Sequence, residues 1–121
     1  MANIETLLVQ WLNTDPALRD YPASMDVPAD RPQRFITVER TGGDDGPVGG
    51  HPMVAIQVWG VSRYECSQTA GLVRHRLLAM PADPLLDAVT GVTIQSTVNF
   101  PLGDIPRYQI LITVDVKNDG R

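Results

Sequence analysis

The chain has 121 residues and a mass of 13.3 kDa, a size that predicts one domain able to bury a core without disulfides or metal. Its net charge of -4 and the absence of a basic run argue against binding of free nucleic acid. A single cysteine, Cys66, excludes an internal disulfide framework and a cysteine-rich zinc site. The chain shows neither a signal-peptide pattern nor a run of about 18 apolar residues, so we expect a soluble, untargeted protein with no membrane partner.

The N-terminal segment is predicted to be a helix that begins after Asn3, whose side chain can accept hydrogen bonds from the first free backbone amides. Apolar residues then recur at spacings of three and four and form one stripe, which consists of Ile4, Leu7, Leu8, Trp11 and Leu12. Asp15-Pro16 predicts a second, short helical turn. Prolines flank residues 25–27 and confine any strand there to a sheet edge, so we expect it to be short or irregular.

Two β-branched runs, residues 35–40 and 53–60, predict a long antiparallel hairpin. Alternation places one set of side chains on a buried face, namely Ile36, Val38, Val54, Ile56 and Val58. The opposite face carries Thr37, Glu39, Gln57 and Trp59, which predicts a half-buried sheet. The connecting segment, residues 41–52, is rich in glycine and exceeds the usual hairpin loop of about two to five residues. We therefore predict a solvated loop, or one that a partner orders, as the first candidate for the working surface.

The central helix is predicted to begin after Ser62 and to run to about Met80, where Pro81 prevents its continuation. Ser62 and Glu65 have the spacing of a capping box. In that motif Ser62 accepts from the Glu65 amide, and the Glu65 carboxylate reaches back to the Ser62 amide. The apolar stripe of this helix consists of Cys66, Ala70, Val73, Leu77 and Met80.

Two further alternating runs predict a second antiparallel hairpin across an irregular loop, residues 100–106. The first run aligns Val92, Ile94 and Val98 on one face, and the second aligns Ile110, Ile112, Val114 and Val116. The order is helix, weak strand, two strands, helix, two strands. This order predicts a single α+β domain over residues 1–121, with an antiparallel four- to five-stranded sheet and two helices packed on one face.

No arrangement of residues predicts catalysis, a metal or a cofactor. The glycine-rich segment lacks the lysine of a phosphate loop and carries Asp44 and Asp45, which would repel an anion. His51 and His75 have no second ligand at metal-binding spacing. Cys66 lies on an apolar stripe, which is typical of a structural thiol. We therefore do not expect an enzyme.

Cations lie on the central helix away from its apolar stripe, namely Arg63, Arg74 and Arg76. They form either a solvated helix face or a surface that meets an acidic neighbour. Asp44 and Asp45 make the glycine-rich hairpin acidic on the same molecule. An acidic hairpin and a basic helix can pair head to tail between identical subunits, and a contact of that type closes rings.

Several short motifs stand out along the chain. They are Arg31-Pro32, Phe35, Val38, Arg40-Thr41-Gly42-Gly43, Val58-Trp59-Gly60 and Pro106-Arg107-Tyr108. In sequence and element order the chain resembles the tail terminator proteins of long-tailed bacteriophages, also described as minor tail or head-to-tail joining proteins. The resemblance covers nearly the whole chain. It departs in the central helix, where Leu72 and Val73 follow Ala70-Gly71 in place of small residues.

The resemblance implies a non-enzymatic homo-oligomeric ring of six subunits that caps the tail tube protein, stops tail growth and docks the head-tail connector protein. DNA can pass through such a ring without sequence-specific contacts. The protein would be assembled in the cytoplasm of a host bacterium and reside in the tail of the virion. Position and charge together give the candidate interface with other subunits or the tail tube: Arg40, Thr41, Gly42, Gly43, Asp44, Asp45, His51, Arg63, Arg74 and Arg76.

Two other interpretations stay open. The first is a ferredoxin-like, small-molecule-binding regulatory module whose ligand lies against the loops or at a dimer interface. The sequence offers no convergent polar cluster to hold such a ligand. The second is a small hydrolase or isomerase. Rings in electron micrographs would favour the tail terminator, whereas compact dimers would favour the regulatory module.

Overall fold

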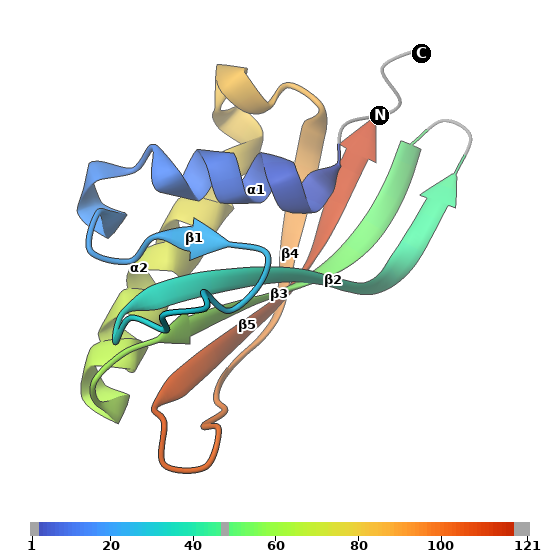
Figure 1. Ribbon diagram of the computed structural model, residues 1–121. Coiled ribbons are helices and arrows are strands. Elements are labelled where there is room, and N and C mark those ends of the chain that lie inside the picture. Colours follow the sequence, from blue (N-terminus) through green and yellow to red (C-terminus); the bar gives the residue numbers. More distant parts are fainter. Residues whose placement is uncertain (1–2, 47–48, 118–121) are drawn as a thin grey trace.

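The computed structural model describes residues 3–46 and 49–117, and it shows a five-stranded sheet with two α-helices on one face (Figure 1). The helices are α1 (Ile4–Asn13) and α2 (Arg63–Ala79). The strands are β1 (Ala23–Ser24), β2 (Phe35–Gly46), β3 (Gly49–Trp59), β4 (Val89–Asn99) and β5 (Arg107–Lys117). Short 3-10 turns are η1 (Pro16–Leu18), η2 (Met80–Ala82) and η3 (Pro84–Leu86). The predicted α+β class is confirmed.

The sheet order is β1-β2-β3-β5-β4, and each half of the domain is a helix followed by a hairpin. Strands β3 and β5 pair antiparallel and join the two hairpins. Strand β1 differs because it pairs parallel with β2. The expected all-antiparallel sheet was therefore wrong at this edge. Residues 25–34 carry the chain back, so that β2 begins at the same end of the sheet as β1.

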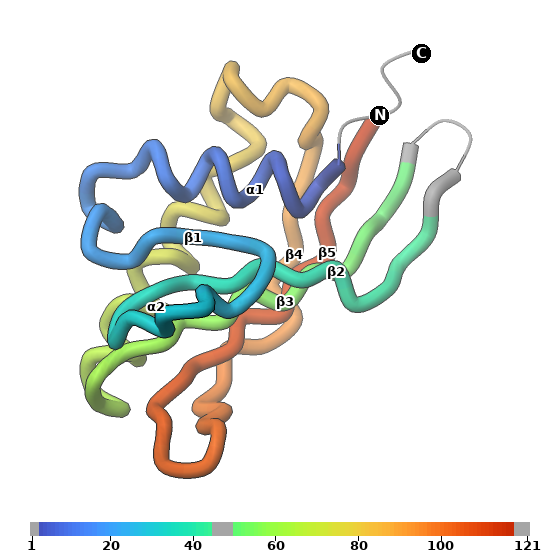
Figure 2. The backbone as a smooth tube through the Cα atoms, viewed as in Figure 1, coloured from blue at the N-terminus to red at the C-terminus, as the bar shows by residue number. Residues whose placement is uncertain are grey.

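The core lies between the two helices and the sheet (Figure 2). The predicted stripe of α2 is confirmed, since all five of its members are fully buried: Cys66, Ala70, Val73, Leu77 and Met80. Leu8 and Leu12 of α1 are buried as well, whereas Leu7 of the predicted stripe is only partly buried. The predicted inward residues of the strands, apart from Val98, face the helices and complete one apolar cluster.

Both helices begin at their predicted caps. Asn3 Oδ1 accepts from the amides of Glu5 (2.8 Å) and Thr6 (3.2 Å), and Ser62 Oγ accepts from the Glu65 amide (3.1 Å). The return bond from the Glu65 carboxylate to the Ser62 amide was wrongly predicted. That carboxylate instead accepts from the Tyr21 hydroxyl and the Arg34 guanidinium, because a charge-assisted bond to arginine is stronger than one to a neutral amide.

Residues 41–52, which we expected to form a loop, mostly continue β2 and β3. Cross-strand pairing reaches the last described residue on each side of the turn, and residues 47 and 48 lie outside the described chain. A bulge follows Arg40, and Gly43 adopts a φ of 93°. A Cβ on Gly43 would lie 2.2 Å from the carbonyl oxygen of His51. The glycines thus allow a bulged ladder to form here.

A bulge in β4, between Ile94 and Ser96, changes which residues share a face. Val92 and Ile94 pack against the core, but Val98 pairs with Gln109 on the other side of the sheet and is 41% exposed. The prediction that Val98 shares a face with Ile94 was wrong. One extra residue in a strand moves every later side chain to the opposite face.

The outer edge of β2 is partly closed by neighbouring elements. Strand β1 pairs with its first residues through Ile36 and Thr37. Farther along, the Glu5 carboxylate of α1 accepts a hydrogen bond from the Arg40 amide (2.9 Å). The bulge then begins directly after this amide, so the edge is not a straight row of free groups.

Candidate functional site

The sheet face opposite the helices has different chemistry at its two ends. Its side chains alternate with the core residues and form rows across the strands. Where β2 begins, Phe35 pairs with Trp59, which in turn pairs with Arg107; we call this the aromatic end. Where β2 ends, Asp44 pairs with His51, which lies beside Asp115 of β5; we call this the acidic end. The whole surface is called the open face below.

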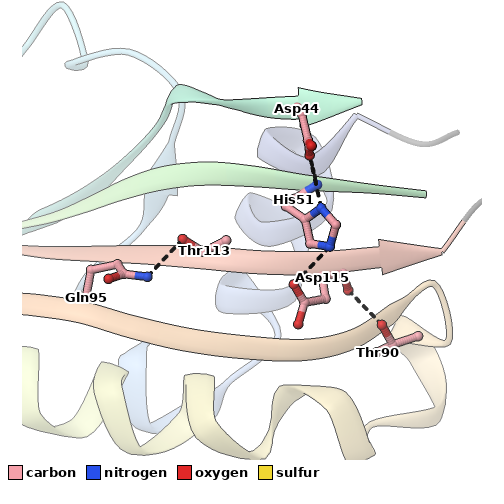
Figure 3. Close-up of polar contacts among 6 residues, drawn as sticks. All are labelled: Asp44, His51, Thr90, Gln95, Thr113 and Asp115. Carbon is pink, nitrogen blue, oxygen red and sulfur yellow. Dashed lines mark hydrogen bonds and ion pairs between the residues drawn. The ribbon is translucent and has the colours of Figure 1, made fainter. Parts of the chain in front are cut away.

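At the acidic end, the His51 ring lies between two carboxylates (Figure 3). Its Nδ1 is 3.0 Å from Asp44 Oδ1, and the His51 backbone amide donates to the same oxygen at 2.9 Å. Its Nε2 is 3.7 Å from Asp115 Oδ1. Hydrogen bonding to the His51 side chain lowers the pKa of Asp44, which therefore stays ionised at neutral pH.

Asp115 has room at this position because Gly91 lies across from it on β4. A Cβ on Gly91 would lie 2.6 Å from Asp115 Oδ2. The sequence analysis missed Asp115 because it is far from His51 along the chain. One signal was present, since Asp115 alternates with Val114 and Val116 and so had to project from the face opposite the core.

The acidic end is an exposed patch of charged side chains. Among the residues that the structure describes, no group of three or more His, Cys, Asp or Glu side chains is arranged to hold a metal ion. Asp44, His51 and Asp115 are all substantially exposed, at 71%, 61% and 45% of their side-chain surface. With a neutral imidazole the patch carries two negative charges, which suits attraction of a cationic surface.

The single thiol of the chain offers no nucleophile at either end. Cys66 lies on the core side of α2 and is fully buried. Burial raises the pKa of the Cys66 thiol, and the nearby Glu65 carboxylate raises it further. Both effects favour the protonated, unreactive form.

At the aromatic end, stacked rings form a platform for two cations. Phe35 and Trp59 stack with ring centroids 4.8 Å apart and an interplanar angle of 17°. The Arg107 guanidinium carbon lies 4.9 Å from the Trp59 ring centroid and 4.8 Å from that of Phe100. The corresponding distance from Arg31 to Trp59 is 5.5 Å. These distances are those of cation–π contacts.

A cleft of about 300 Å³ opens beside this platform. Arg31, Pro32, Phe35, Trp59, Ile105 and Pro106 contribute to its walls. The fold therefore brings four of the motifs named above to one place. We had placed Trp59 on a polar, half-exposed face, but its side chain is only 3% exposed, and Thr37 beside it is 6% exposed. Trp59 Nε1 donates to Thr37 Oγ1 at 3.2 Å, so an apolar ring and a hydroxyl bury each other.

The candidate interface residues of β2 are spread over its bulged segment. The Arg40 guanidinium donates to the Gly42 carbonyl oxygen (3.1 Å), and Thr41 is exposed. Gly43 shapes the bulge as described above, and Asp44 meets His51 at the acidic end. The Asp45 side chain lies outside what the structure describes, although its backbone pairs with β3.

The three candidate cations of α2 lie across the sheet from the acidic end. Arg63 and Arg74 are exposed. The Arg76 guanidinium forms an ion pair with Asp15, with Nε 2.7 Å from Oδ2. Within one molecule, α2 packs on the core side of the sheet, whereas Asp44 lies on the open face. Any pairing of these charges would have to occur between copies of the chain.

Comparison with known proteins gives no further assignment. None of the helices within residues 3–46 and 49–117 is long and apolar enough to cross a bilayer. No protein-family model matches this chain, and no curated protein sequence matches it either. A functional assignment therefore depends on the two ends of the open face.

Proposed function

We propose that this protein is a tail terminator: a ring of six copies that caps the tail tube of a long-tailed bacteriophage, stops its elongation and provides the surface on which the head connector docks. The observation that carries the proposal is the opposite chemistry at the two ends of the open face. Arg31 and Arg107 mark one end and Asp44 and Asp115 the other. Unlike surfaces at opposite ends of one subunit suit the heterologous contacts that build rings.

The extended β2–β3 hairpin supports the proposal because its outer part is paired backbone. Its strands are hydrogen-bonded on both sides of the turn, and β5 runs beside β3 as far as Gly49. A preformed arm loses less conformational entropy on binding than a mobile loop does. It can therefore present Asp44 and His51 to a neighbour in a fixed arrangement.

The middle of the open face supports assembly as well. Gln57 Nε2 donates to Gln109 Oε1 at 3.0 Å, and Thr37 Oγ1 donates to Gln57 Oε1 at 3.2 Å. This hydrogen-bonded row crosses three strands without a charge.

The chain as a whole carries a net charge of -4, which suits a ring through which DNA passes without being held.

Electron microscopy of the purified protein tests the proposal directly. We expect negatively stained particles to be rings with a central hole, and light scattering to give the mass of six chains. A variant in which Asn-Gly replaces residues 44–51 should lose the rings. The replacement joins Gly43 to Pro52, which are cross-strand partners, through a two-residue turn of a favoured type.

The shortened variant should retain the circular dichroism spectrum and the thermal cooperativity of the parent. Gln68→Ala, at an exposed position of α2 outside the candidate interface, is the control and should keep the rings. Rings formed by the shortened variant would exclude the hairpin as a subunit contact. A parent protein that stays monomeric, even with tail tube protein present, would exclude the tail terminator itself.

The cleft at the aromatic end favours a second candidate, the small-molecule-binding regulatory module. Its volume of about 300 Å³ lies at the lower limit for such sites, and its walls combine apolar side chains with Arg31. This candidate predicts compact dimers in place of rings. It also predicts that an anionic aromatic compound raises the melting temperature of the parent but not that of Arg31→Ala.

A further inference from the structure

We infer that the cleft at the aromatic end receives the acidic end of a second copy of this chain. The receiving cations are Arg31, in the wall of the cleft, and Arg107, on the adjoining Trp59 ring. The inference rests on the proposed ring and specifies which surfaces meet in it. It also replaces the outer face of α2, which the sequence had suggested as the basic partner, by a surface on the open side of the sheet.

The cations of this protein differ in whether a carboxylate already neutralises them. Arg34 pairs with Glu65, and Arg76 pairs with Asp15. Within the described part of the chain, neither Arg31 nor Arg107 forms an ion pair; each lies against an aromatic ring. Asp104 lines the cleft but pairs with neither of them. These two guanidiniums are thus available to an incoming carboxylate.

Arg107 has a particular need for such a partner. Its Nε donates to the Phe100 carbonyl oxygen at 2.8 Å, while its terminal nitrogens have further protons to donate. Partial burial removes some of the hydration of the Arg107 guanidinium and thereby lowers its pKa. A carboxylate that approaches two terminal N–H groups restores those hydrogen bonds with a charge-assisted pair.

The acidic end has the matching chemistry and position. Asp44 and Asp115 are exposed and share a single imidazole, so the patch stays negative whether or not His51 is protonated. The two surfaces lie at opposite ends of the same strands. A contact between unlike ends repeats from copy to copy, and it closes into a ring when the rotation per subunit allows.

Charge-reversal variants separate this surface from α2. We expect Arg31→Glu and Asp44→Lys each to weaken self-association, measured by sedimentation velocity at low salt, by up to about fivefold per contact, the ratio for an exposed pair worth ~1 kcal/mol. Arg31→Glu combined with Asp44→Lys should restore part of the loss. Arg74→Glu is the matched control. Alone it should leave self-association unchanged, and combined with Asp44→Lys it should not restore the association that Asp44→Lys loses. Arg107 is left unchanged because it packs on Trp59.

Mixing the two single variants gives a readout that does not require a ring. Arg31→Glu retains a working acidic end, and Asp44→Lys retains a working cleft. The mixture should therefore form pairs of one copy of each that are up to about fivefold stronger than the self-association of either variant alone. Absence of such pairs overturns the inference, as does restoration by Arg74→Glu. If the parent forms no ring but the mixture still pairs, the proposed function fails while the contact between cleft and acidic end stands.

Discussion

The two ends of the β2–β3 hairpin differ in what their side chains contact. At its base both faces are covered: Ile36 and Val58 are fully buried on the helix side, and Phe35 and Trp59 are 1% and 3% exposed on the other. Beyond the bulge after Arg40, charged side chains project into solvent. The base stabilises the fold, and the outer part is free to make contacts with other molecules. One hairpin thus combines a buried base with an exposed, charged outer part.

Truncation at the base should have the largest effect on stability. Ile56→Ala removes a fully buried side chain from the centre of β3, so we expect the free energy of unfolding to fall by about 2–5 kcal/mol. Thr41→Ala, in the exposed outer part, should change it by roughly 0.5 kcal/mol or less. Urea titration followed by circular dichroism measures both values. Equal losses would show that the outer part contributes to the core.

Two adjacent glycines allow a smaller test within the outer part. Gly43→Ala forces a Cβ against backbone at a φ of 93°, so we expect a loss of about 1–3 kcal/mol. Gly42→Ala is the control, because a Cβ there meets nothing within 4 Å. A harmless Gly43→Ala substitution would mean that the bulged ladder rearranges easily and is not a preformed arm.

The smallest effect should appear in the dependence of stability on pH. Arg34, and then Tyr21, hold the pKa of Glu65 below its ordinary 4.5, so ionised Glu65 stabilises the fold above pH 4.5. This contribution is lost as pH falls through the lowered native pKa. The melting temperature of Glu65→Gln should therefore fall less on acidification than that of the parent. Asp44→Asn should change the acid response less, because that carboxylate is more exposed.

Features that local sequence determines were predicted correctly. Asn3 and Ser62 mark the helix starts, since a cap needs only neighbouring amides. The stripe of α2 follows from the helical repeat of 3.6 residues, and the core face of β5 follows from simple alternation. These patterns depend on a few consecutive residues, so they can be recognised before the tertiary structure is known.

Features that depend on distant segments were missed. Glycines and aspartates have low strand propensity, yet residues 41–46 extend along β3 because β3 and β5 provide the ladder. Trp59 is buried on the open face because the Arg31-Pro32 segment and Arg107 cover it. The pairing of His51 with Asp115 depends on the register between β3 and β5. Alternation indicates the face on which Trp59 and Asp115 lie, but it does not identify the distant residues that they contact.

The edges of the sheet also constrain how copies of this protein can associate. A straight edge strand invites further strands to add indefinitely, as in fibrils. Here the Glu5 carboxylate occupies the Arg40 amide at one edge, and bulges interrupt both β2 and β4. Growth by backbone pairing is thereby disfavoured at either edge. Copies that meet would then do so through side chains, and the rotation that such a contact imposes decides whether the assembly closes.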